Sequence, residues 1–263
     1  MRVIIKPDYD IVSKWVANYV VYRINKFKPT KDKPFVLGLP TGSTPLGMYK
    51  ELIKMYNERK VSFENVVTFN MDEYVGLKPT DKQSYRYFME ETFFKHINIK
   101  PQNIHMLDGM TKDYEKECKN YEKAIKEVGG IHLFIGGIGA DGHIAFNEPF
   151  SSLSSRTRVK TLTESTIKAN SRFFDNDISK VPTTALTVGI ATILDAKEVI
   201  IIATGENKAT ALKHGIEGSV NHMWTISALQ MHQHGIIVCD KPATKELSTD
   251  TVEYFLDIEK NNF

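Results

Sequence analysis

The chain of 263 residues has little cysteine and no long apolar run. Its two cysteines, Cys118 and Cys239, lack the spacing of a zinc site or a redox pair, so we expect buried, reduced thiols unless the fold brings them together. No window approaches the roughly 20 apolar residues of a membrane span. The segment that begins at Met1 has no apolar core of a signal peptide. We therefore expect a cytoplasmic protein without membrane contact.

An excess of charge of either sign is also missing. The 34 basic and 32 acidic residues leave a formal charge of +2, which argues against a broad nucleic-acid-binding surface. Any phosphate group must then be bound by a few well-placed basic residues. The apolar fraction of 41% is ordinary for a globular protein, and no linker composition divides the chain. We expect one domain, residues 1–263.

Short β-branched segments alternate with segments of helical period. Helices are expected at 9–27, 45–60, 112–129 and 207–218. Strand-like segments that are apolar throughout, each followed by a helix, indicate an α/β fold with an open, mostly parallel sheet covered on both faces. The expected strands are RVIIK, FVLGLP, VVTFNMDE, IHLFIGG, TALTVGI, EVIIIATG and GIIVCD. Residues 146–183 lack clear periodicity and are either partly helical or a functional lid.

The segment FIGGIGADGHIAFNEP, residues 134–149, contains a G-x-G-x-x-G pattern after an apolar strand. A dinucleotide-binding motif would need its last glycine to open a helix, but Asp141 and His143 flank Gly142 and Pro149 follows closely. The carboxylate of Asp141 would also repel a bound phosphate. Dinucleotide binding is therefore disfavoured.

The same segment suits proton transfer. Asp141, His143 and Glu148 would project from one loop at the carboxyl end of a strand, and a carboxylate beside histidine can set its tautomer and charge. A metal site is an alternative, weakened by the single histidine. An ordinary solvated loop is a further alternative.

A second loop has the features of a phosphate site. In LGLPTGSTPLGMYK, residues Thr41, Gly42, Ser43 and Thr44 precede Pro45, a natural first residue of a helix. Hydroxyl and free N–H groups at a helix N-terminus bind anions, although Ser43 or Thr44 could simply cap the helix. Arg172 and Lys208 are candidate cations. In VVTFNMDEY, Asp72 ends an apolar strand, where burial would raise its pKa and suit a general base, although a hydrogen-bonded turn acid is possible.

Seven segments together resemble the glucosamine-6-phosphate deaminase family over nearly the whole chain. They are LPTGSTPLGMYK, VVTFNMDEYVGL, GGIGADGHIAFNEP, SSLSSRTRVKTLT, NSRFFDND, ALTVGI and VNHMWTISALQMH. The Asp-Gly-His segment also occurs in 6-phosphogluconolactonases, whereas TFNMDEY and NHMWTISALQ are more specific to the deaminases.

The resemblance implies conversion of glucosamine 6-phosphate and water to fructose 6-phosphate and ammonia, in amino-sugar catabolism, without a metal or other cofactor. His143 would open the sugar ring, with Asp141 and Glu148 orienting it, and Asp72 would move a proton from C2 to C1. The substrate phosphate would be held by Thr41, Gly42, Ser43, Thr44, Arg172 and Lys208.

The resemblance also implies a regulatory site. In the allosteric members of the family, matching residues bind N-acetylglucosamine 6-phosphate between subunits of a homohexamer. Those residues correspond here to Met1, Ser151, Ser152, Arg158, Lys160, Thr161 and Tyr254. From the sequence alone this basic, hydroxyl-rich segment would be a solvated surface.

Two other functions stay open. A 6-phosphogluconolactonase would use the same histidine loop without a base at position 72. A sugar-phosphate sensor would bind without catalysis, although such proteins usually carry a DNA-binding module and the α/β pattern here begins at residue 3.

Overall fold

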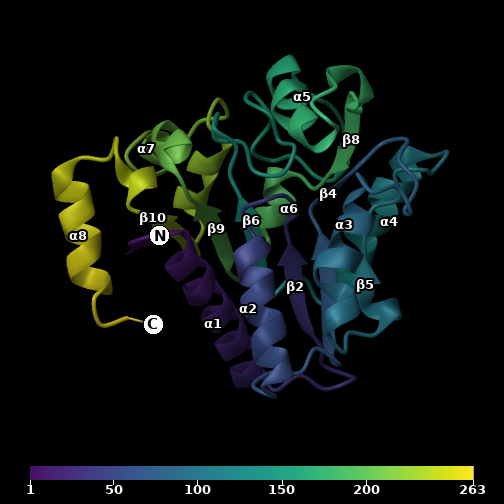
Figure 1. Ribbon diagram of the computed structural model, residues 1–263, viewed down its shortest axis with the longest axis horizontal. Coiled ribbons are helices and arrows are strands. Elements are labelled where there is room, and N and C mark those ends of the chain that lie inside the picture. Colours follow the sequence, from purple (N-terminus) through teal and green to yellow (C-terminus); the bar gives the residue numbers. More distant parts are fainter. Residues whose placement is uncertain (263) are drawn as a thin grey trace.

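A seven-stranded parallel sheet forms the centre of the molecule, as the computed structural model shows for residues 1–262 (Figure 1). Its strands are mostly apolar and mostly buried, which is the pattern expected of a covered parallel sheet. In spatial order they are β1 (Arg2–Lys6), β10 (Gly235–Asp240), β9 (Val199–Ala203), β6 (Leu133–Gly137), β2 (Phe35–Leu39), β3 (Val66–Asn70) and β5 (Ile104–His105). The expected α/β fold with an open parallel sheet is confirmed.

Helices cover both faces of this sheet. One face packs against α1 (Tyr9–Phe27), α2 (Leu46–Asn57) and α3 (Tyr85–Thr92), which stand in front of it in Figure 1. The other face packs against α4 (Tyr114–Glu127), α6 (Ile190–Leu194) and α7 (Ala209–Ile216). The last helix, α8 (Thr249–Glu259), lies beside β1 at the sheet's edge. None of the helices within residues 1–262 is long and apolar enough to cross a membrane.

Side-chain caps explain several helix starts. Asp8 accepts the N–H of Ile11 at the start of α1, and Asp113 accepts that of Lys116 at the start of α4.

Short 3-10 helices occupy Phe94–His96, Pro101–Asn103, Ser171–Phe173, Ile178–Lys180, Glu206–Lys208, Thr225–Met231 and Pro242–Thr244.

A second, three-stranded antiparallel sheet stands above the carboxyl edge of the parallel sheet. It consists of β4 (Asp72–Tyr74), β8 (Thr184–Thr187) and β7 (Arg158–Thr161), with β8 in the middle. The expectation that 184–190 forms a parallel strand is therefore wrong in orientation. The single strand expected over 66–73 divides at Met71, because Asp72 leaves the parallel sheet to pair with Thr187.

Residues 146–183 are partly helical, as one of the two sequence interpretations had it. They contain β7, the helix α5 (Glu164–Asn170) and two of the 3-10 helices. Leu162, Phe174 and Val181 pack with Tyr74 and Phe146 into a small apolar cluster of their own. This cluster holds the segment over the carboxyl ends of the central strands, at the top of Figure 1.

Candidate active site

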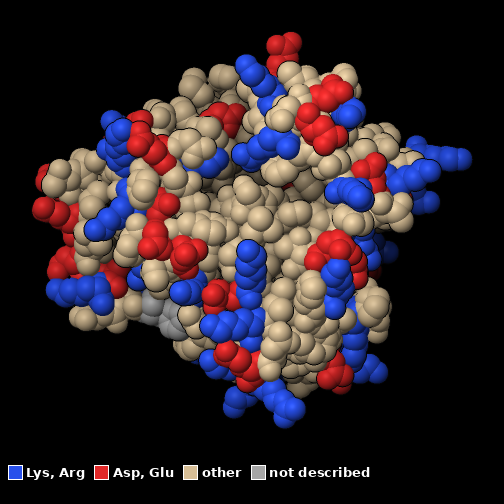
Figure 2. Space-filling model, viewed as in Figure 1, with Lys and Arg blue, Asp and Glu red and all other residues tan. Residues whose placement is uncertain are grey.

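A cavity of about 340 Å³ opens where the carboxyl ends of β2, β3, β6 and β9 meet. Open α/β sheets bind ligands at this edge. In Figure 2 the middle of the visible face is hollowed and mostly uncharged, and Lys and Arg side chains lie along the upper border of this hollow. The cavity walls include Thr41, Gly42, Ser43, Thr44, Asp72, Asp141, His143, Arg172 and Lys208. The structure thus brings together nine of the ten residues predicted for catalysis and substrate binding.

The tenth residue, Glu148, lies behind the cavity wall. Its side chain is 1% exposed, and its Oε2 atom lies 3.7 Å from Nδ1 of His143. The same Nδ1 atom lies 2.7 Å from Oδ1 of Asp141, yet the approach is not aligned for a full hydrogen bond. Burial alone would raise the pKa of Asp141, but its contacts with His143 outweigh this and lower that pKa overall. Both carboxylates therefore lie on the Nδ1 side of the imidazole.

The 138–148 loop places these groups by turning sharply after β6. Gly142 has φ +79°, and an added Cβ would lie 2.7 Å from the ring of Trp224, so only glycine fits there. The chain then turns without forming a helix, which agrees with the argument against a dinucleotide site. Thr225, fully buried, donates its hydroxyl to the loop carbonyls and accepts the N–H of Ile144.

Asp72 enters the cavity from the other strand tip. Its side chain is 7% exposed, and burial together with the neighbouring Glu73 raises its pKa to about 8. The Glu73 carboxylate points elsewhere, because it accepts the N–H groups of Tyr85 and Arg86 at the start of α3. Asp72 is therefore a carboxyl group whose pKa lies close to neutral pH, as a general base requires.

The 41–44 loop lies between β2 and α2. Gly42 has φ +89°, which allows the loop to turn back on the helix. Neither Ser43 nor Thr44 caps α2, which begins at Leu46 directly after Pro45 and has no side-chain cap, and both residues line the cavity. This arrangement favours an anion site over the plain cap that the sequence also allowed.

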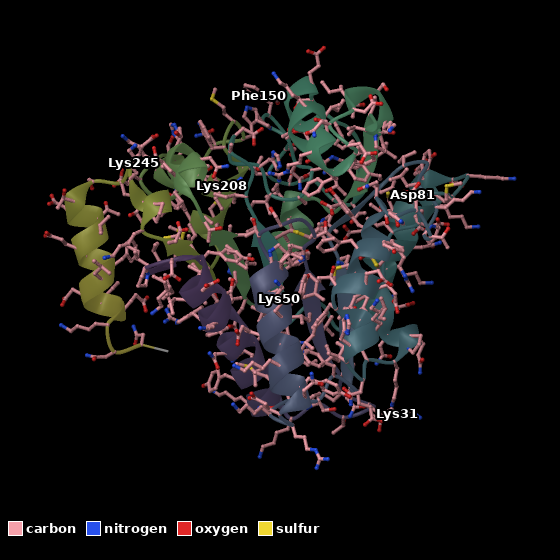
Figure 3. The ribbon with its side chains drawn as sticks, viewed as in Figure 1. Lys31, Lys50, Asp81, Phe150, Lys208 and Lys245 are labelled. Carbon is pink, nitrogen blue, oxygen red and sulfur yellow. The ribbon has the colours of Figure 1, made fainter. Side chains whose placement is uncertain are left out.

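Two cations complete this end of the cavity. Lys208 lies beside α7 on the side facing the middle of the molecule (Figure 3), at the end of the 3-10 helix that follows β9. Burial lowers its pKa, and the nearby positive charge of Arg172 lowers it further. A bound dianion would favour the charged form of Lys208 again, because it would compensate the two positive charges.

The residues predicted for the regulatory site fall into two groups. Ser151, Ser152, Arg158, Lys160 and Thr161 lie on β7 and the loop before it. The Oγ atom of Ser151 is buried and has no partner among the described residues. Met1 and Tyr254 instead line a separate depression between Met1, the end of α7 and α8, so one chain does not bring the two groups together.

Several cavity residues escaped sequence analysis. Tyr85, Phe146, Ser165, Thr166, Ala169 and Asn170 also line the cavity. The hydroxyl of Tyr74 accepts the side-chain N–H of Asn170, one of these lining residues, at 2.8 Å. Phe146 and Asn170 lay in quoted segments without being singled out, and no residue pattern marks the other four.

Among the described residues, one group could hold a metal ion. Ligand atoms of Asp141, His143 and Glu148 lie within 4.8 Å of one another. A single histidine with two carboxylates is a weak zinc set, and the His143–Asp141 contact already occupies two of the three.

Comparison with known proteins agrees with this geometry. Residues 7–238 match the family of glucosamine-6-phosphate isomerases and 6-phosphogluconolactonases. The glucosamine-6-phosphate deaminase of Phocaeicola vulgatus is 66% identical, with both chains covered completely. The deaminase of Treponema denticola is 65% identical over the whole of this chain and 97% of its own.

Solved structures show the same fold. A monomeric glucosamine-6-phosphate deaminase superposes with a TM-score of 0.89 at 38% identity, covering 94% of this chain and all of its own. The 6-phosphogluconolactonase of Trypanosoma cruzi reaches a TM-score of 0.73 at 19% identity, over 94% of this chain and 97% of its own, which supports the fold alone. The chain is therefore an enzyme of the glucosamine-6-phosphate isomerase and 6-phosphogluconolactonase family, and its near relatives there are glucosamine-6-phosphate deaminases.

Proposed function

We propose that the protein converts glucosamine 6-phosphate and water to fructose 6-phosphate and ammonia. The observation that carries this proposal is that one cavity is lined by a buried carboxyl group, Asp72, a histidine beside two acids, and an anion loop with two cations. A lactonase needs the histidine and the phosphate site but no second base at position 72. The near relatives of this chain carry the deaminase name.

The chemistry divides between the two strand tips. With the phosphate held by the 41–44 loop, Lys208 and Arg172, His143 takes the proton of the C1 hydroxyl and returns a proton to the ring oxygen, which opens the pyranose. Asp141 and Glu148 hold the imidazole and stabilise its charged form. Binding through the phosphate fixes the sugar between the two acid–base centres.

Asp72 then acts on the open-chain aldehyde. Its carboxylate removes the C2 proton while the substrate's ammonium group gives a proton to the C1 oxygen, which yields an enol amine, and the protonated carboxyl then returns a proton to C1. The resulting imine at C2 adds water and loses ammonia, which leaves the ketone of fructose 6-phosphate. The raised pKa of Asp72 suits both halves of this transfer, because the group must take up and release the same proton near neutral pH.

The direct test is to incubate the purified protein with glucosamine 6-phosphate and measure ammonia and fructose 6-phosphate separately. Equal amounts of both support the proposal. Binding without product would indicate a sensor. Faster hydrolysis of 6-phosphogluconolactone than deamination would favour the lactonase.

We also propose activation by N-acetylglucosamine 6-phosphate at an interface between subunits of a homohexamer in the cytoplasm, as part of amino-sugar catabolism. In support, Arg158 and Lys160 share β7 with Thr161, and the Ser151 hydroxyl in the loop before β7 has no partner among the described residues. Met1 and Tyr254 lie in another depression that a neighbouring subunit could contribute. The monomeric relative shows that deaminases of this fold need not form hexamers.

Light scattering and effector titration test this second proposal. A hexamer whose substrate saturation curve moves to lower concentration with N-acetylglucosamine 6-phosphate supports it. Replacing Arg158 by Gln should abolish that shift. A monomer, or a hexamer with an unchanged curve, would contradict the regulatory assignment while leaving the catalytic one intact.

A further inference from the structure

The proposed mechanism requires two separate strand tips to keep a fixed distance, since Asp72 and the 138–148 loop act on the same sugar. The two tips belong to different strands of the parallel sheet, β3 and β6, which are not neighbours because β2 lies between them. A connection must therefore come from outside that sheet. The middle strand of the second sheet, β8, supplies it.

Thr187 lies at the end of β8, opposite Asp72 of β4. The next residue extends the contact, because the N–H of Val188 donates to the carbonyl of Met71 at 2.8 Å. The backbone of residues 187–188 is thus fixed to the two residues that carry and precede the proposed base.

The polar atoms of Thr187 and Val188 form hydrogen bonds with the 138–148 loop. The Oγ1 atom of Thr187 accepts the N–H of Phe146 at 3.1 Å, and its hydroxyl donates to the carbonyl of Val188. That carbonyl also accepts the side-chain N–H of Asn147 at 2.8 Å. Phe146 and Asn147 directly precede Glu148, so Thr187 holds the part of the loop that sets this acid behind His143.

The loop needs such support at this point. Ala145 lines the cavity and has φ +53°, a left-handed backbone conformation that residues other than glycine rarely adopt. Strained conformations of this kind persist only where the surroundings hold them. The hydrogen bond from Phe146 to Thr187 follows the strained residue immediately.

We infer that Thr187 is a positioning residue for the reaction, which fixes the distance between Asp72 and the His143–Glu148 group through its hydroxyl. The inference rests on the proposed function. Thr187 is fully buried and does not line the cavity, so it acts through these groups and does not touch the substrate.

Two isosteric substitutions test the inference. Thr187→Val keeps the shape but leaves Phe146 without an acceptor, and we expect kcat to fall about 10- to 100-fold, the cost of a small misplacement of reacting groups. Among the described residues no hydrogen bond joins the 41–44 loop to Thr187, so inhibition by inorganic phosphate should be unchanged. Thr187→Ser keeps the acceptor and should retain most of the wild-type kcat.

Thr68→Val is the matched control. Thr68 is also a fully buried strand residue, but its Oγ1 atom has no hydrogen-bond partner among the described residues. The same change there should leave kcat at the wild-type value. A general effect of replacing a buried threonine would instead lower kcat in both variants and overturn the inference.

Should Thr187→Val fail to fold, Thr187→Ser and Thr187→Ala form the decisive pair, because both lack the γ-methyl and only Ala lacks the hydroxyl. We expect kcat of the Ser variant to exceed that of the Ala variant about tenfold at equal melting temperature. Equal kcat values would overturn the inference. A wild-type protein that releases no ammonia would instead refute the proposed function, so the two failures are distinguishable.

Discussion

The Glu73 carboxylate accepts the backbone N–H of Arg86 at 2.9 Å, so this acid anchors the start of α3 while its neighbour Asp72 faces the cavity. Adjacent acids thereby have different surroundings. Burial raises the pKa of Glu73, and three backbone N–H groups, including that of Tyr74, limit this rise by donating to its carboxylate. Within residues 1–262 the Asp72 side chain has no such donor, and its pKa is raised to about 8. The different surroundings of Asp72 and Glu73 lead to two predictions about pH dependence.

The pH dependence of kcat/KM should report Asp72. A base with a pKa of about 8 in the free enzyme is protonated below that pH and inactive. We expect kcat/KM to fall about tenfold per pH unit below 8 and to level off above it. Steady-state kinetics from pH 6 to 9.5 measure this, and a profile that is flat across the window would contradict the assignment of Asp72.

Removing the neighbouring charge should shift that profile. Glu73→Gln eliminates the repulsion that adds to burial in raising the pKa of Asp72, so the fall in kcat/KM should begin at a lower pH than in the wild type. Ionisations of the substrate are common to both enzymes, and any difference belongs to the protein. Circular dichroism checks that α3 remains formed. Superimposable profiles would show that Glu73 does not influence the base.

Asp72→Asn should lower activity and raise stability together. Loss of the base should lower kcat about 10²- to 10⁴-fold. Because burial raises the pKa of Asp72, the folded state binds a proton more tightly than the unfolded state. The free energy of unfolding therefore decreases as the pH rises from the ordinary aspartate pKa to about 8.

Asp72→Asn has no carboxyl group to ionise, so its free energy of unfolding does not decrease in this way as the pH rises. Its melting temperature should match the wild type near pH 4 and exceed it at pH 8 by several degrees, since 1 kcal/mol corresponds to about 2–4 °C for a chain of this size. Exposed Asp32 provides the control, because Asp32→Asn should show no such pH-dependent gain. Equal melting temperatures of Asp72→Asn and wild type at pH 8 would contradict the burial argument.

Lys208 should contribute to binding more than to chemistry. Lys208→Gln removes one charge-assisted hydrogen bond to the phosphate, and such bonds contribute about 1.5–3 kcal/mol, so KM should rise about 10- to 100-fold. Lys50, exposed on the outer side of α2 in Figure 3, gives the control variant Lys50→Gln with unchanged KM. An unaltered KM in Lys208→Gln would place the phosphate elsewhere.

Local sequence predicted the framework well, because the buried strands are mostly apolar. The segments 35–39, 199–203 and 235–240 are strands, and 9–27 and 114–127 are helices, close to their expected bounds. The site residues were predictable where chemistry and strand ends coincide. Asp72 and His143 each follow an apolar strand, and both line the cavity.

The second sheet was not predictable in the same way. β7 has the sequence RVKT, whose charged residues read as a solvated loop, and it is a strand only because it pairs with β8. The break at Met71 likewise depends on the antiparallel partner of Asp72. Thr187 carries no local sign of its contact with Phe146, which joins residues 41 positions apart.

The most direct test of the central claim is a crystal structure with an unreactive open-chain amino alcohol analogue of glucosamine 6-phosphate. The account predicts its phosphate against the 41–44 loop and Lys208, with C1 and C2 between the Asp72 carboxyl group and the His143 imidazole. An analogue whose sugar carbons lie in another cavity, or that contacts only one of these two side chains, would contradict it.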